Sequence, residues 1–117
     1  MIDFVDGAAA RRARRYPITA AMEFRAAGDT WYEGITVNIG ARGVLFRTRN
    51  SMPISTRVEM RIALSPEGPT TGAHIACTGR VVRSERTPAA GYAYLAVAID
   101  QVQLRPAAHR RRTQERG

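Results

Sequence analysis

The sequence has few of the residues on which disulfide-bonded, metal-binding and catalytic proteins depend. Cys77 is the only cysteine, so no disulfide can form within the chain and no zinc motif is present. The two histidines, His74 and His109, lack the spacing of metal ligands or of a nucleophile and its base. No phosphate-binding G-x-x-x-x-G-K-[ST] motif and no evident carboxylate pair occurs. We therefore expect no catalysis, no metal and no cofactor.

Long apolar segments are also missing. No stretch approaches 18 apolar residues, so we expect no transmembrane helix. Residues 1–10 lack the positive region followed by a long apolar region that marks a secretory signal. The sequence therefore predicts a cytoplasmic protein.

Lysine is absent as well, and this shapes the charge of the chain. All 18 basic residues are arginines, against 10 acidic residues, which gives a formal net charge of +8. A guanidinium binds phosphate with a planar fork and stacks on purine rings, which an ammonium does not. The charge favours an anionic partner: a nucleotide, a nucleic acid or a membrane surface.

The pattern of apolar residues predicts an all-β fold. With 117 residues and 44% apolar content, the chain can form one globular domain. Six segments have the length, composition and bounding turns of strands: 18–26, 31–37, 43–48, 58–64, 73–86 and 92–99. We expect a six-stranded antiparallel β-barrel, because closure removes the sheet edges of a small domain. Gly34 and Gly79 are expected to mark a bulge or a bend.

The two ends of the chain are predicted to lie outside this barrel. Residues 1–10 are weakly patterned and are expected to be flexible, so the domain would span residues 11–104. Residues 100–104 are expected to form a short helical turn that ends at Pro106. Residues 105–117 form a basic C-terminal tail, which we expect to be solvated.

Four arginines in five residues stand directly before the first predicted strand. Arg11, Arg12, Arg14 and Arg15 run into Tyr16 and Pro17. Cations this close repel one another, so the segment needs water or an anion around it. The proline biases the preceding residue to an extended conformation, which holds the last arginine against the domain. We prefer Arg11 with Arg15 as a phosphate-binding pair, although Arg12 or Arg14 could replace one of them by a shift of register.

A second short segment, Asn38 to Gly43, lies between two predicted strands. Asn and Gly are common in turns, where both tolerate positive φ, and this alone could explain Asn38, Gly40 and Gly43. A glycine turn also lets a ligand approach the backbone closely. An Asn carboxamide can bond to a purine edge, and Arg42 lies where it could reach a ligand or solvent. Turn chemistry and ligand binding therefore both remain open for this segment.

Together the two segments resemble the signatures of PilZ domains, the bacterial receptors for cyclic di-GMP. Arg11 and Arg15 match the RxxxR motif that precedes the first strand, while Asn38, Gly40 and Gly43 fall on the (D/N)xSxxG motif between the second and third strands. Segments 44–46, 79–83 and 95–99 are also similar, so the resemblance covers about residues 11–104.

The resemblance implies a cyclic di-GMP receptor that regulates a protein partner. Arg11 and Arg15 would bind the phosphates and guanines of the ligand, which often binds as an intercalated dimer. Asn38 would contact a guanine edge, and Gly43 would allow close approach. Gly40 stands where the family usually has Ser, and one lost neutral hydrogen bond costs about 0.5–1.5 kcal/mol, or roughly two- to tenfold in affinity. We therefore expect binding to be weakened but retained.

Two other functions remain open at this point. A PilZ-like adaptor that has lost its ligand would work through protein contacts alone, and Gly40 is the residue in its favour. A small β-barrel that binds nucleic acid is the third hypothesis, favoured by the net charge of +8 and the arginine-rich tail. No strand clearly alternates basic and aromatic residues, which places this hypothesis last.

Overall fold

The computed structural model describes residues 15–87 and 90–107, and within them every regular element is a strand. The strands are β1 (Arg15–Tyr16), β2 (Ala21–Ala26), β3 (Tyr32–Gly40), β4 (Gly43–Thr48), β5 (Arg57–Ala63), β6 (His74–Thr87) and β7 (Tyr92–Arg105). No helix in this part of the chain has the length and apolar character needed to cross a membrane.

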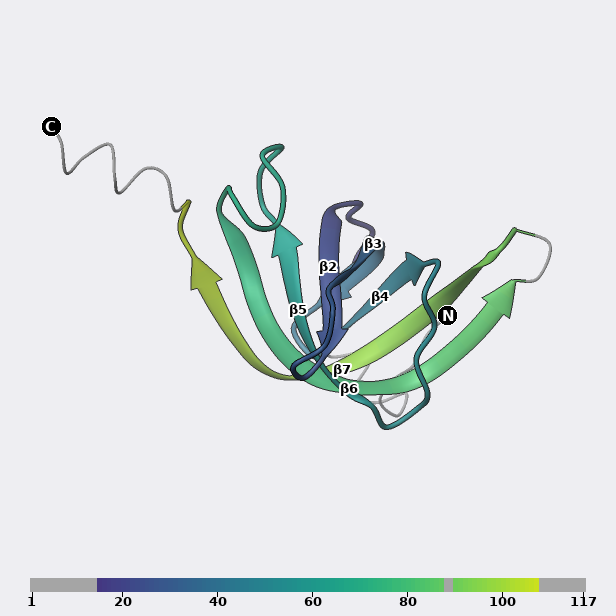
Figure 1. Cartoon of the computed structure of the whole chain (residues 1–117). Coiled ribbons are helices and arrows are strands. Elements are labelled where there is room, and N and C mark those ends of the chain that lie inside the picture. Colours follow the sequence, from purple (N-terminus) through teal and green to yellow (C-terminus); the bar gives the residue numbers. More distant parts are fainter. Residues whose placement is uncertain (1–14, 88–89, 108–117) are drawn as a thin grey trace, which may run out of the picture.

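Six of the strands close into an antiparallel barrel, as the sequence predicted. The sheet order is β1-β3-β2-β5-β6-β7-β4, and an additional β3–β4 pairing joins its two sides. The two-residue β1 pairs only with the end of β3 and lies beside the barrel. The long β6 and β7 curve together around the shorter strands (Figure 1).

The core fills the inside of this barrel with alternate residues of each strand. Phe24 and Phe46 are fully buried, with ring centroids 4.8 Å apart. The other buried members of the cluster are Met22, Val44, Met52, Val58, Met60, Ile62, Cys77, Val81, Leu95 and Val97. Because strand side chains alternate between faces, residues such as Leu45 and Arg80 point outward. The outer face is therefore where a ligand or a partner can be met.

Gly79 lies at a bulge in the β6–β7 pairing, and the extra residue of this bulge, Asp100, belongs to β7. The β6–β7 register shifts between Thr78 and Gly79. A Cβ at this position would collide with the carbonyl oxygen of Ala98 and lie 2.7 Å from Val97 Cγ1. Only glycine allows β7 to cross this closely, which lets the two long strands bend around the core.

The predicted helical turn at residues 100–104 is wrong. β7 continues to Arg105, and its last residues pair with the start of β6, from Gln101 opposite Thr78 to Arg105 opposite His74. The local sequence alternates polar and apolar residues, a pattern that suits a strand once a partner is present. Pro106 ends this strand, and a proline ends a strand as readily as a helix.

The first predicted strand begins later than expected. β2 starts at Ala21, and residues 17–20 are irregular. The buried Thr36 hydroxyl donates to the Ile18 carbonyl at 2.6 Å and accepts from the Ala20 N–H at 2.8 Å. Together with the bond from the Thr36 N–H to the Ala20 carbonyl at 3.0 Å, this side chain fixes the path from β1 to β2.

Candidate functional site

The two motifs meet through the backbone pairing of β1 with β3. Arg15 lies opposite Gly40, and Tyr16 lies opposite Ile39. Cross-strand partners in an antiparallel pair are about 4.5–5.5 Å apart between Cα atoms, so the end of the arginine segment lies beside the glycine motif. Arg11 and Arg12 lie outside the described residues, and their place in the site stays a prediction.

Asn38 follows an irregularity in β3 that changes the direction of its side chain. The β3–β4 register shifts between Thr36 and Asn38, so the buried Thr36 and the next paired residue fall on opposite faces of the sheet. Asn38 pairs with Leu45, an outward residue between two buried ones. Its Oδ1 is buried and has no hydrogen-bond donor among the described residues. A buried amide oxygen that stays unsatisfied is unfavourable by about 1–3 kcal/mol, so a donor from outside the described residues would be stabilising at this point of the outer face.

The turn at the end of β3 is shorter than the sequence suggested. Asn38 and Gly40 belong to β3, and only Ala41 and Arg42 link it to β4. The glycines with positive φ in the described chain are Gly28, Gly68 and Gly91. Gly40 and Gly43 therefore do not need glycine for a left-handed conformation, and backbone conformation does not account for glycine at either position.

Arg42 and Gly43 lie where β4 meets β7. Arg42 is exposed, and its carbonyl oxygen accepts a hydrogen bond from the Ile99 N–H at 2.9 Å. Gly43 is buried and lies opposite Ala98. The backbone of Arg42 is thus held by the barrel, while its exposed position leaves the guanidinium available to an anion on the outer face.

The sheet brings a further arginine to this region that the sequence analysis did not select. Arg80 is exposed and lies opposite Ala98, which itself lies opposite Gly43, so two strand spacings, about 10 Å, separate Arg80 from Gly43. None of the ion pairs among the described residues includes Arg80, whereas Arg57 beside it pairs with Asp100 at 3.2 Å. The register of three strands, β6, β7 and β4, places Arg80 near Gly43, so no local signal could have identified it.

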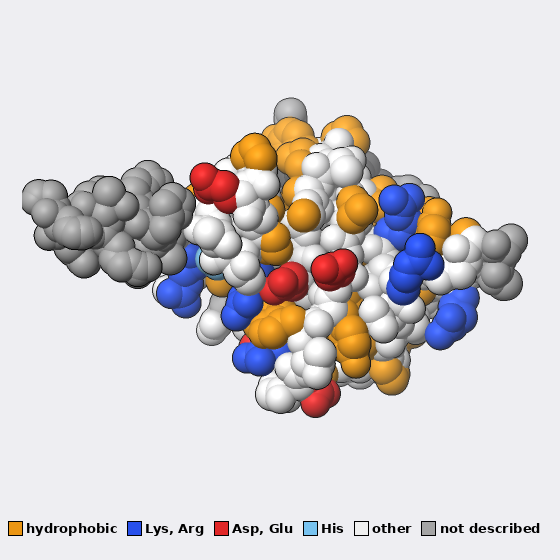
Figure 2. Space-filling model, turned by 45° about the horizontal axis from the view of Figure 1, so that its top comes forward, with side chains coloured by type: hydrophobic (Ala, Val, Ile, Leu, Met, Phe, Trp, Pro, Cys, Tyr) orange, Lys and Arg blue, Asp and Glu red, His pale blue; other side chains and the backbone are white. Residues whose placement is uncertain are grey.

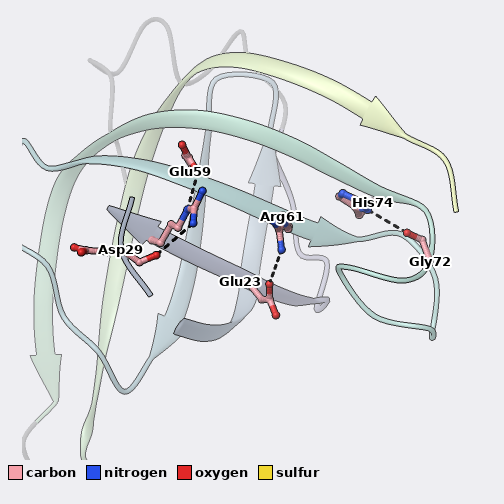
Figure 3. Close-up of polar contacts among 7 residues, drawn as sticks. Glu23, Asp29, Glu59, Arg61, Gly72 and His74 are labelled. Carbon is pink, nitrogen blue, oxygen red and sulfur yellow. Dashed lines mark hydrogen bonds and ion pairs between the residues drawn. The ribbon is translucent and has the colours of Figure 1, made fainter. Parts of the chain in front are cut away.

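Another part of the outer face holds arginines that are already paired. Across β2 and β5, Arg25 bonds Glu59 at 2.8 Å and Arg61 bonds Glu23 at 3.3 Å (Figure 3). Both guanidiniums also lie over the Trp31 ring, at 4.4 and 3.8 Å from its centroid. Because carboxylates and an indole satisfy these cations, we assign them to stabilisation of the sheet rather than to ligand binding.

A groove on the described surface is lined in part by these paired arginines. It has a volume of about 870 Å³ and is lined by Trp31, Arg61, Ala76 and Gln103, among others. None of the described residues of either motif lines it. The candidate ligand site is thus a part of the outer face beside β1 and β3 rather than this groove.

Basic and acidic side chains alternate on the face shown in Figure 2. Arginine side chains lie to either side of a central pair of acidic side chains and do not form one continuous basic stripe there. A nucleic-acid backbone usually meets a continuous stripe or patch of Lys and Arg. This face therefore gives no support to the nucleic-acid hypothesis.

Two kinds of reactive group bear on catalysis among the described residues: metal-binding clusters and an activated thiol. No group of three or more His, Cys, Asp or Glu residues in ranges 15–87 and 90–107 could hold a metal ion. Burial raises the pKa of the Cys77 thiol to about 11, since the charged thiolate would lose its hydration. A thiol with so high a pKa is a poor nucleophile at neutral pH, and Cys77 belongs to the core.

Comparison with known proteins identifies the family. Four chains of solved structures match, among them the Bacillus subtilis inhibitor of motility MotI/DgrA, with a TM-score of 0.63 and 16% sequence identity. That match covers 80% of this chain and 44% of the MotI/DgrA chain, so this chain spans less than half of that protein. No curated protein sequence matches. The model of the PilZ domain matches residues 9–112. The chain therefore belongs to the PilZ domain family.

Proposed function

We propose that the chain is a cyclic di-GMP receptor module that regulates a protein partner. Membership of the PilZ family makes this ligand the first candidate. Arg11 and Arg15 would bind its phosphates and guanines, with Arg12 beside them. Asn38, Gly40, Arg42 and Gly43 would form the other side of the site. The module would act by binding, with no catalytic step.

The unpartnered Asn38 oxygen is the observation that carries the proposal. Oδ1 is buried on the outer face without a donor among the described residues, two positions before the residue that pairs with Arg15. The edge of a guanine presents N–H donors, and one of these would satisfy the oxygen.

Charge would supply most of the affinity. Each bidentate guanidinium–phosphate contact contributes about 1.5–3 kcal/mol, and stacking of a guanidinium on a purine adds roughly 0.5–2 kcal/mol. A ligand with two negative charges would bring arginines together that repel one another in its absence. The arginine segment would then be held against the barrel, and the surface offered to a partner would change.

Isothermal titration calorimetry with cyclic di-GMP tests the proposal directly. We expect the unsubstituted chain to bind, and Arg15→Ala to weaken binding about ten- to one-hundredfold through loss of one charge-assisted contact. Asn38→Ala should weaken it by a smaller factor. Arg86→Ala is the matched control, because Arg86 is exposed on β6 opposite Ala93 and belongs to neither motif.

Cyclic di-AMP and GTP provide the matching ligand controls. A guanine-selective pocket should bind cyclic di-GMP and reject cyclic di-AMP, and it should depend less on salt than a nucleic-acid surface does. No heat with any concentration of cyclic di-GMP up to the high micromolar range would refute the proposal.

Gly40 favours one other function, that of a PilZ-domain adaptor without a ligand. The hydroxyl that the family motif usually supplies is missing at this position. Such an adaptor would bind its partner equally well with and without cyclic di-GMP, whereas a receptor would not. A pull-down of one partner in both conditions separates the two functions.

A further inference from the structure

The last six residues of β7 form an edge of the sheet. The pairing of β7 with β4 ends at Ala98, and the Ile99 N–H donates to Arg42. From residue 100 to residue 105, β6 is the only strand that pairs with β7 in the part of the chain that the structure describes. Figure 1 shows this yellow-green end of β7 as the outermost strand, curving away from the other strands. Unpaired strand edges carry free N–H and C=O groups and recruit further strands.

Two exposed apolar side chains lie on this edge. Val102 is 59% exposed and Leu104 is 68% exposed. Each one ends a row of apolar residues that crosses the sheet from the core. The two rows are Met60, Cys77, Val102 and Ile62, Ile75, Leu104. Since the rows are apolar up to their last residue, a further strand at this edge would extend the core rather than interrupt it.

We propose that this edge pairs with the same edge of a second copy of the chain. In an antiparallel arrangement about a two-fold axis at Gln103, Val102 lies opposite Leu104 of the second copy. Opposite residues in a ladder point to the same face, so the apolar rows of both copies join into continuous rows. In this register each residue from 101 to 105 lies opposite a residue that points to the same face of the sheet, so apolar side chains meet apolar side chains and polar side chains meet polar ones.

The charges of the edge fit the same arrangement. Residues 99–105 carry one acidic residue, Asp100, and one basic residue, Arg105, near opposite ends. Asp100 pairs with Arg57 at 3.2 Å, yet 43% of its side chain remains exposed. Antiparallel pairing sets Arg105 opposite Gln101 of the second copy, next to Asp100 of that copy. Arg105 of each copy therefore lies near Asp100 of the other copy, once at each end of the paired segment.

The edge is short, and this sets the strength of the association. Pro106 follows β7 directly and has no N–H to donate, so the paired segment cannot extend further along that strand. Specific protein interfaces usually bury about 800 Å² on each partner, and a six-residue edge approaches only the small end of this range. We therefore expect a reversible dimer with a dissociation constant on the order of micromolar.

Cysteine cross-linking of the full chain without nucleotide tests the register. Gln103→Cys places two thiols opposite each other at the axis, so mild oxidation should give a disulfide-linked dimer. Gln101→Cys is the matched control, because four residues, roughly 13 Å, separate the two thiols along the seam. The unsubstituted chain should not cross-link, since Cys77 is buried.

Sedimentation velocity tests the association itself. Leu104→Glu should weaken the dimer at least tenfold, while Ile54→Glu, a loop position 59% exposed, should leave it unchanged. A chain that stays monomeric up to several hundred micromolar would overturn the proposal. Equal cross-linking through Gln101→Cys and Gln103→Cys would overturn it too. The dimer does not depend on cyclic di-GMP binding, and these measurements contain no nucleotide, so either proposal can fail without the other.

Discussion

Restoring the hydroxyl that the family motif usually carries should strengthen ligand binding. The substitution is Gly40→Ser, at the last residue of β3, opposite Arg15. Gly40 does not have positive φ, so a serine can adopt the same backbone conformation without strain. A neutral hydrogen bond contributes about 0.5–1.5 kcal/mol, which corresponds to a two- to tenfold lower dissociation constant for cyclic di-GMP.

Gly40→Ala is the control that isolates the hydroxyl. Both substitutions add a Cβ and reduce the freedom of the unfolded chain, so both should raise the free energy of unfolding by about 0.4–1 kcal/mol. Only the serine adds a donor and an acceptor. Calorimetry on the two variants therefore compares the hydroxyl alone, and denaturant unfolding confirms that both are folded.

Equal affinities for the serine and alanine variants would refute this reasoning. That result would mean that residue 40 does not face the ligand, even though it pairs with the end of the arginine segment. A serine variant that binds more weakly than the unsubstituted chain, with its fold intact, would show that the ligand needs the space that glycine leaves.

Three further predictions concern the barrel itself. Gly79→Ala should lower the free energy of unfolding by about 1–3 kcal/mol in urea titrations, because the new Cβ meets the carbonyl oxygen of Ala98. An unchanged midpoint of urea unfolding would contradict the close approach of β6 and β7. Thr36→Val should lower the free energy of unfolding by about 1–3 kcal/mol, because the hydroxyl bonds the Ala20 N–H and the Ile18 carbonyl. An unchanged free energy of unfolding would show that water replaces these two bonds. Folding raises the pKa of the Cys77 thiol from 9.0 to about 11. The neutral thiol therefore contributes about 3 kcal/mol to the free energy of unfolding below pH 9, and this contribution is lost as the pH rises toward 11. Stability measured against pH should fall more steeply in this window for the unsubstituted chain than for Cys77→Ala, and parallel curves would contradict the burial of the thiol.

Strand positions were the most predictable part of this protein. Residues 57–63 alternate apolar and charged residues, and that period of two both predicts a strand and assigns its inner face. The irregularity at Gly79 was predictable for a similar reason, because a glycine inside a long strand pattern often marks a bulge or a close approach of another backbone. The error at residues 100–104 came from a segment too short to distinguish a helical turn from a strand end without knowledge of its partner.

The sequence by itself determined the six strands, the inner face of β5 and the two motifs of the PilZ family, because these depend on local alternation and on residue type. Only the tertiary structure decided that Arg15 lies beside Gly40, that Asn38 lacks a donor among the described residues, and that Arg80 lies near Gly43. The register of pairing between strands distant in sequence sets these neighbours. That register depends on bulges and on how the barrel closes, neither of which a local pattern contains.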